Sequence, residues 1–171
     1  MRGATFPAIR EWASEGAQLP DRGWSEITDA GFCSLHALAE EEERARGALP
    51  AAFWTARSRV AIERGADPLC AELEMNNTPL HWCAWRAAPG CARALLDAGA
   101  AARSRNRADE SAEDVCRRLL RAEAPSGPRS ERMSLLLEML VASRERETLG
   151  RACGPPRAAG RDGSSREGGR L

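Results

Sequence analysis

Two Leu-His pairs, each followed at a distance by a Gly-Ala pair, show that the chain repeats itself. The better preserved copy is Thr78-Pro79-Leu80-His81, which precedes Gly99-Ala100, and an earlier copy, Leu35-His36, precedes Gly65-Ala66. Thr78 lies thirty-three residues before Ser111, and the two Gly-Ala pairs are thirty-four residues apart. A period of this length is typical of solenoids, whose units bury their apolar faces against neighbouring units. We therefore expect an extended surface and not an enclosed pocket.

The units resemble the ankyrin repeat family, in which a β-turn or hairpin with the motif glycine, any residue, Thr-Pro-Leu-His leads into two antiparallel helices. The second unit keeps this motif except that Asn76 replaces the glycine. The first unit keeps Gly31 but has Cys33-Ser34 for Thr-Pro, and the third has Asp109 at the glycine position but lacks the leucine and histidine. That position usually requires positive φ, which asparagine and aspartate tolerate best among the other residues. The resemblance covers about residues 6–142 and implies an all-α, ankyrin-like helix-pair solenoid with short β-hairpin or turn connections.

The repeat divides the chain into five expected segments. The first unit carries an acidic insertion at Glu40–Pro50, and its run of four glutamates is either a solvated helix face or an acidic contact site. From Gly150 onward the chain is rich in glycine and arginine and poor in apolar side chains, which is typical of disorder. The segments are 1–26, an N-terminal half-repeat cap; 27–67, repeat 1 with the insertion; 68–101, repeat 2; 102–146, repeat 3 with the C-terminal cap; and 147–171, a disordered tail.

The residues of the repeat motif are expected to hold the fold. Thr78 can cap its helix by accepting backbone N–H bonds, and Pro79 suits the first helical position. The resemblance implies that His36 and His81 tie neighbouring turns together by hydrogen bonds. A catalytic or metal-binding role is disfavoured because no carboxylate or cysteine stands at ligand spacing beside both histidines. The structural residues of the motif are Leu35, His36, Gly65, Thr78, Pro79, Leu80, His81 and Gly99.

Partner contacts are expected on one side of the stack. In ankyrin repeats, the hairpin tips and the first helix of each pair form a concave side that binds other proteins. Aromatic and arginine side chains dominate interface energies, so we expect Trp82 to contribute most, with packing into the core as the alternative. The implied contact residues of the second and third units are Glu72, Leu73, Glu74, Met75, Trp82, Trp85, Arg86, Arg103, Arg105, Asn106 and Arg107, and those of the first unit are Ala37, Glu40 and Glu41.

The hairpins of this side carry opposite charges. Arg103, Arg105 and Arg107 alternate along the chain, so an extended hairpin would place all three on one face. Glu72 and Glu74 occupy the preceding hairpin. The pattern predicts a groove with a negative and a positive side, and the alternative is a solvated hairpin tip.

Composition limits the other classes of function. The 25 basic and 25 acidic residues leave a net charge of zero, so no global field attracts nucleic acid or an anionic membrane. No signal peptide or membrane span is visible. Six cysteines without a C-x-x-C pair predict buried free thiols in a reducing compartment, hence an intracellular protein, cytoplasmic or nuclear. All basic residues are arginine, which fits either a GC-rich coding sequence or a chain spared ubiquitin attachment.

The expected function is a non-enzymatic protein-binding module, an adaptor or scaffold that acts as a monomer on another protein, with no cofactor, metal or catalytic residue. One alternative is contact with nucleic acid or an acidic partner through the arginine-rich hairpin and tail. An enzyme is disfavoured because no nucleophile or phosphate-binding motif is present and the side chains of His81 and Cys83 diverge on a helix. A third alternative is a fold that needs its partner for stability, since three units are few for a solenoid.

Overall fold

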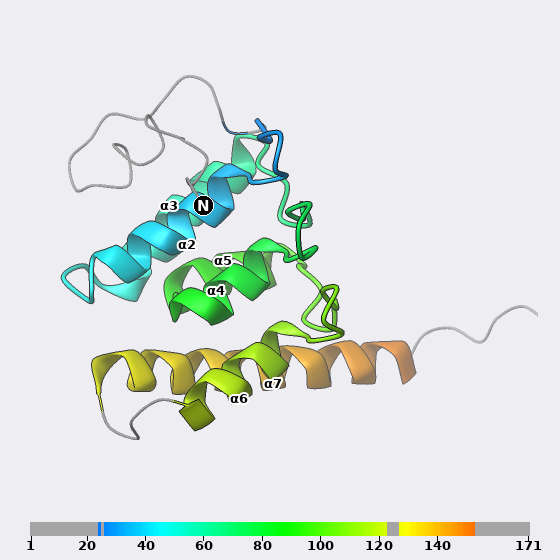
Figure 1. Ribbon diagram of the computed structural model, residues 1–171. Coiled ribbons are helices and arrows are strands. Elements are labelled where there is room, and N and C mark those ends of the chain that lie inside the picture. The colour runs from blue at the N-terminus through cyan, green and yellow to red at the C-terminus, as the bar shows by residue number, and fades with distance from the viewer. Residues whose placement is uncertain (1–23, 25, 123–126, 153–171) are drawn as a thin grey trace, which may run out of the picture.

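The computed structural model describes Trp24, residues 26–122 and residues 127–152. Helices in these residues form three stacked pairs (Figure 1). The pairs are α2 (Ser34–Arg44) with α3 (Ala51–Glu63), α4 (Pro79–Arg86) with α5 (Pro89–Asp97), and α6 (Ala112–Ala122) with α7 (Pro128–Ala152). Within the described residues, β pairing is limited to an isolated antiparallel bridge between Ile27 and Cys33. The fold is therefore an all-α, ankyrin-like helical repeat, as the sequence predicts.

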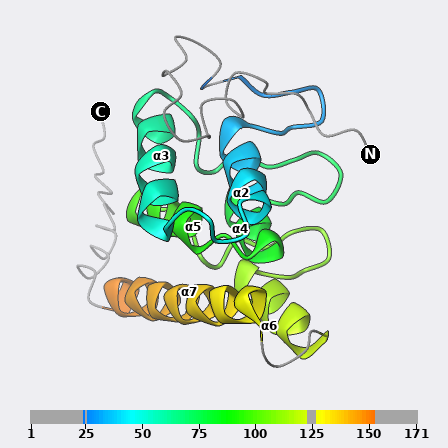
Figure 2. The same ribbon diagram turned by 90° about the vertical axis from the view of Figure 1, so that its left-hand side faces the viewer.

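The six helices lie in two layers. The first helices of the pairs, α2, α4 and α6, contact one another in order, and α5 packs between α3 and α7 in the second layer (Figure 2). The connections 64–78 and 98–111 extend from the same side of the stack (Figure 1). These two connections thus lie side by side at one edge of the stack.

Each first helix follows a residue with positive φ. Gly31 has φ 81°, Asn76 has φ 56° and Asp109 has φ 59°. Each stands three residues before the first residue of its helix. These values confirm the sequence prediction, because only glycine, asparagine and aspartate adopt this conformation at low cost. The turn therefore has the same geometry in all three units although its sequence differs.

Leucines and small residues form the core. Leu38, Leu80 and Leu95 are fully or almost fully buried, and Cys83 and Ala84 allow α4 to approach its neighbours closely. On α7, the buried side chains Met133, Leu136 and Leu140 follow helical spacing and cover the open end of the stack. The long last helix therefore closes the apolar face that a further repeat would otherwise bury.

The extra residues of the first unit are divided among three elements. α2 has 11 residues and α3 has 13, whereas α4 has 8 and α5 has 9. The remainder lengthens the connection 45–50. At the other end, α7 continues to Ala152, so residues 147–152 are helical and the expected tail boundary after Arg146 is wrong. Most of the expected N-terminal cap lies outside the described residues. The tail from residue 153 lies outside them as well.

Candidate interaction surface

Both histidines connect a helix start to the next hairpin. In the second unit, the N–H of Thr78 donates to His81 Nδ1 at 3.2 Å, and His81 Nε2 lies 3.0 Å from the carbonyl oxygen of Glu110. In the first unit, His36 accepts from the N–H of Cys33 at 3.0 Å, and its Nε2 lies 3.3 Å from the carbonyl oxygen of Asn77. Both rings are therefore neutral, with the proton on Nε2. This is the structural role that the ankyrin resemblance implies.

These buried histidines predict acid sensitivity. Burial lowers the pKa of His36 from 6.5 to about 4 and also lowers the pKa of His81. Unfolded histidine binds a proton below about pH 6.5, whereas folded His36 does so only near pH 4, so stability is lost as the pH falls through this window. We expect His36 to cost up to about 1.4 kcal/mol per pH unit in this window, and His81, whose pKa is lowered by burial as well, to add to the loss below about pH 6.5.

Urea unfolding between about pH 7 and about pH 5 measures this loss. Burial raises the pKa of Glu42 above its usual value, although its hydrogen bonds act against this shift. Folded Glu42 therefore binds its proton at a higher pH than unfolded glutamate does, so this carboxyl adds stability as the pH falls, opposite to the histidines. The Glu42→Gln variant is therefore expected to lose stability more steeply on acidification than the native chain does. A free energy of unfolding that stays constant over this range would contradict the histidine assignment.

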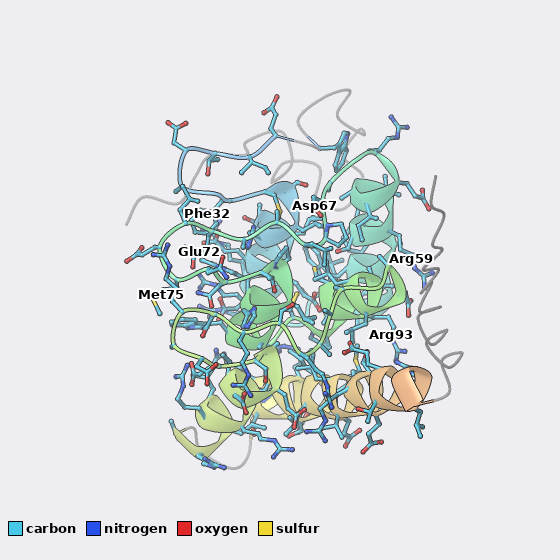
Figure 3. All side chains as sticks on the ribbon, turned by 90° about the vertical axis from the view of Figure 1, so that its right-hand side faces the viewer. Phe32, Arg59, Asp67, Glu72, Met75 and Arg93 are labelled. Atoms are coloured by element: carbon cyan, nitrogen blue, oxygen red, sulfur yellow. A yellow bond between two sulfur atoms is a disulfide. The ribbon has the colours of Figure 1, made fainter. Side chains whose placement is uncertain are left out.

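The connection 64–78, which is the second hairpin of the stack, exposes apolar side chains at its tip. Leu73 is 62% exposed and Met75 is 39% exposed. The hairpins are bonded to one another, since the N–H of Leu73 donates to the carbonyl of Ala30 at 2.9 Å and the N–H of Arg107 donates to the carbonyl of Met75 at 2.8 Å. Figure 3 looks onto these connections and shows Met75 at the edge opposite Arg93. The exposed tips therefore sit on a backbone that hydrogen bonds hold in place.

Glu72 is a turn-forming residue and not a contact residue, which corrects the expectation from the sequence. Its side chain is 4% exposed. Its carboxylate accepts the N–H groups of Glu74 at 2.7 Å, Met75 at 2.9 Å and Asn77 at 3.2 Å. Glu74, by contrast, is exposed at the tip. The carboxylate of Glu72 thus shapes the hairpin, and the side chains of Leu73, Glu74 and Met75 are exposed to solvent.

The two tryptophans of α4 have different environments. Trp82 is half-buried, with its ring edge-on to Phe32 at 5.0 Å and Arg86 stacked over it at 5.1 Å. Arg86 in turn donates to Glu43 at 2.9 Å across to α2. Trp85 is 50% exposed. Trp82 thus packs at the junction of two units, as in the core-packing alternative for this residue, whereas the side chain of Trp85 faces solvent.

The three alternating arginines do not share a face, so that expectation is wrong. Arg103 reaches Thr148 on α7 at 2.8 Å, Arg105 contacts the carbonyl of Asp109, and Arg107 donates to the carbonyl of Glu74 at 2.7 Å. Residues 103–107 contain no strand, so period-two alternation does not apply. With Glu72 buried as well, the predicted groove of opposite charges is absent from this surface.

One glutamate of the acidic run is buried and caps a helix of the next unit. Glu42 is 4% exposed, and its two carboxylate oxygens accept the N–H groups of Gly90 at 2.8 Å and Cys91 at 2.9 Å. The expectation of a solvated face is therefore wrong at this position. Ala88 precedes α5 and offers no capping side chain, which is the sequence signal that a distant acceptor was needed.

Two of the six cysteines are paired, which corrects the expectation of free thiols. Cys33 and Cys70 are joined by a disulfide, whereas Cys83, Cys91 and Cys116 are free and buried. The two partners stand 37 residues apart, so no local spacing indicates the pairing. The fold brings them together because the start of α2 packs against the beginning of the next hairpin.

The geometry defines a helical-repeat protein whose units are joined through paired turns. The ankyrin repeat family model matches residues 75–110, which include Thr78-Pro79-Leu80-His81, helices α4 and α5, and the following hairpin. This segment is therefore an ankyrin repeat, and such repeats are generally protein-interaction modules. No curated protein matches the chain. Among the described residues, no helix combines the length and apolar character needed to cross a membrane.

Proposed function

We propose that the chain is a non-enzymatic protein-binding module that holds a partner protein on its hairpin tips and first helices. The observation that carries this proposal is the exposure of Leu73 and Trp85, at 62% and 50%, on a repeat scaffold whose hairpins are hydrogen-bonded to one another. Large apolar side chains at such sites bury substantial area at low entropic cost when a partner binds. Leu73, Met75 and Trp85 are the proposed contact residues, with Glu74 and Arg107 beside them.

The arginines favour a protein partner over nucleic acid. Arg105 lies 3.5 Å from the carboxylate of Asp109 and 3.8 Å from that of Asp114, and Arg118 pairs with Glu110 at 2.7 Å. Phosphate binding rewards clustered guanidinium groups, whereas these groups already hold acidic neighbours. The surface is therefore better suited to a partner with apolar side chains of its own.

Substitution of the two exposed apolar residues tests the proposal. The double variant Leu73→Ser, Trp85→Ala is expected to bind a partner recovered with the native chain at least about thirtyfold more weakly, which corresponds to about 2 kcal/mol. Because both side chains are exposed, the free energy of unfolding should change by less than about 0.5 kcal/mol. Pull-down from a cell extract, followed by titration of the recovered partner, measures the change.

Leu135→Ser is the matched control, because Leu135 is 47% exposed but lies on α7. This variant should keep native affinity. Equal weakening in both variants would indicate a general loss of solubility or fold, and full retention in the double variant would contradict the proposed surface.

A further inference from the structure

In the first unit, cysteines stand at two positions where the second unit has hydroxyl residues near its histidine, His81. Cys33 stands where the second unit has Thr78, three residues before the histidine in both cases. Cys70 follows Gly65 by five residues, as Ser104 follows Gly99. Thr78 Oγ1 lies 2.8 Å from His81 Nδ1, and Cys33 Sγ lies 3.2 Å from His36 Nδ1. The first unit therefore keeps the histidine but has two cysteine sulfur atoms close to its ring.

The imidazole presents the nitrogen that a metal ion requires. His36 Nε2 donates to the carbonyl oxygen of Asn77, which leaves the lone pair on Nδ1. Nδ1 lies 3.2 Å from Cys33 Sγ and 3.9 Å from Cys70 Sγ. Sulfur and nitrogen ligands of a tetrahedral zinc ion lie about 3.5 Å apart, between these two values. Small side-chain rotations would therefore bring the three atoms around one ion.

The surroundings fit a structural ion. Cys33, His36 and Cys70 are buried, and the His36 ring lies edge-on to Phe32 at 5.3 Å and to Trp82 at 5.9 Å. The Cα atoms of the two cysteines are 7.0 Å apart, just beyond the usual disulfide range of up to about 6.8 Å. Once the S–S bond is reduced, that separation leaves room for an ion between the two sulfur atoms. The carbonyl oxygen of Asp67 lies 4.0 Å from Cys33 Sγ and can serve as a fourth ligand.

We propose that Cys33, His36 and Cys70 form a binding site for a thiophilic divalent cation, Zn²⁺ in particular, when the two cysteines are reduced. A thiol reductant such as glutathione supplies two electrons and two protons, which break the S–S bond and give two thiols. Zn²⁺ then displaces both thiol protons and bonds to the two thiolates and to Nδ1. The ion replaces the hydrogen bond from the N–H of Cys33 and joins the start of α2 to the next hairpin.

Metal titration of the full reduced chain tests this site. Co²⁺ added under anaerobic conditions is expected to bind at one ion per chain with sulfur-to-cobalt charge-transfer absorption, and Zn²⁺ should displace it. Cys70→Ser and Cys33→Thr restore the residues found at Ser104 and Thr78, so both variants should fold. Each is expected to bind at least about a hundredfold more weakly, because each lacks a thiolate ligand.

Cys153→Ser is the matched control and should bind Co²⁺ as the native chain does. Circular dichroism and urea unfolding establish that each variant is folded, and either single variant is sufficient if the other fails. The proposal is overturned if the reduced native chain binds no more Co²⁺ than the two variants. It is equally overturned if Cys33 and Cys70 stay disulfide-bonded under reducing conditions in which the remaining thiols are free.

Discussion

Replacing Glu42 with alanine is expected to lower the free energy of unfolding by about 3 kcal/mol. The carboxylate is the acceptor for the buried N–H groups of Gly90 and Cys91, which alanine would leave without a partner in an apolar environment. The side chain also fills space between α2 and α5, so its removal leaves a cavity. Loss of this contact therefore weakens both the start of α5 and the junction between the first two units.

Urea unfolding of two further variants separates these causes. Glu41→Ala removes a neighbouring carboxylate that pairs with Arg44 at the surface, and we expect it to cost less than about 1 kcal/mol. Glu42→Gln keeps an oxygen acceptor and the side-chain volume, so its cost should fall between the two alanine variants. A Glu42→Ala variant as stable as Glu41→Ala would show that the N–H groups of α5 do not depend on Glu42.

The second large effect is expected at Gly31, where alanine should cost about 3 kcal/mol or more. Gly31 has φ 81°, which disfavours any side chain. A Cβ there would also lie 2.7 Å from the carbonyl oxygen of Ala71, 2.8 Å from Glu72 Cα and 2.9 Å from the N of Leu73. These atoms belong to the backbone of the next hairpin, so the two hairpins would have to separate.

Gly99→Ala is the matched control for this prediction. Gly99 has φ 85°, but a Cβ at this position has nothing within 4 Å. Its alanine variant should therefore show only the conformational cost, about 1 to 2 kcal/mol. The difference between the two variants in thermal or urea unfolding measures the clash between hairpins. If Gly31→Ala costs no more than Gly99→Ala, the close packing of the first two hairpins is wrong.

Features encoded by neighbouring residues could be predicted from the sequence. The positive φ values at Asn76 and Asp109 and the helix starts after Cys33 and Thr78 depend on a few consecutive side chains, and the repeat motif specifies them. The helical-repeat fold followed because the same short pattern recurs at a fixed period. Local rules and the period together were sufficient for the architecture.

Features that depend on contacts between units could not be predicted in the same way. Glu42 caps a helix 48 residues further along the chain, and Cys70 meets Cys33 only because two units stack. The sequence predicts Glu72 at the exposed tip, whereas its carboxylate accepts backbone N–H groups inside the turn. Likewise, Trp82 packs and Trp85 is exposed because the side of α4 that carries Trp82 is the one that meets Phe32.

Partner proteins are expected to bind the side formed by the hairpins and first helices. A photo-reactive amino acid placed in separate variants at Leu73, Trp85 and Arg93 tests it directly, since Arg93 is exposed on the edge away from Met75 (Figure 3). We expect the same partner to be crosslinked from Leu73 and from Trp85 but not from Arg93. Crosslinking from Arg93, with none from the other two positions, would contradict it.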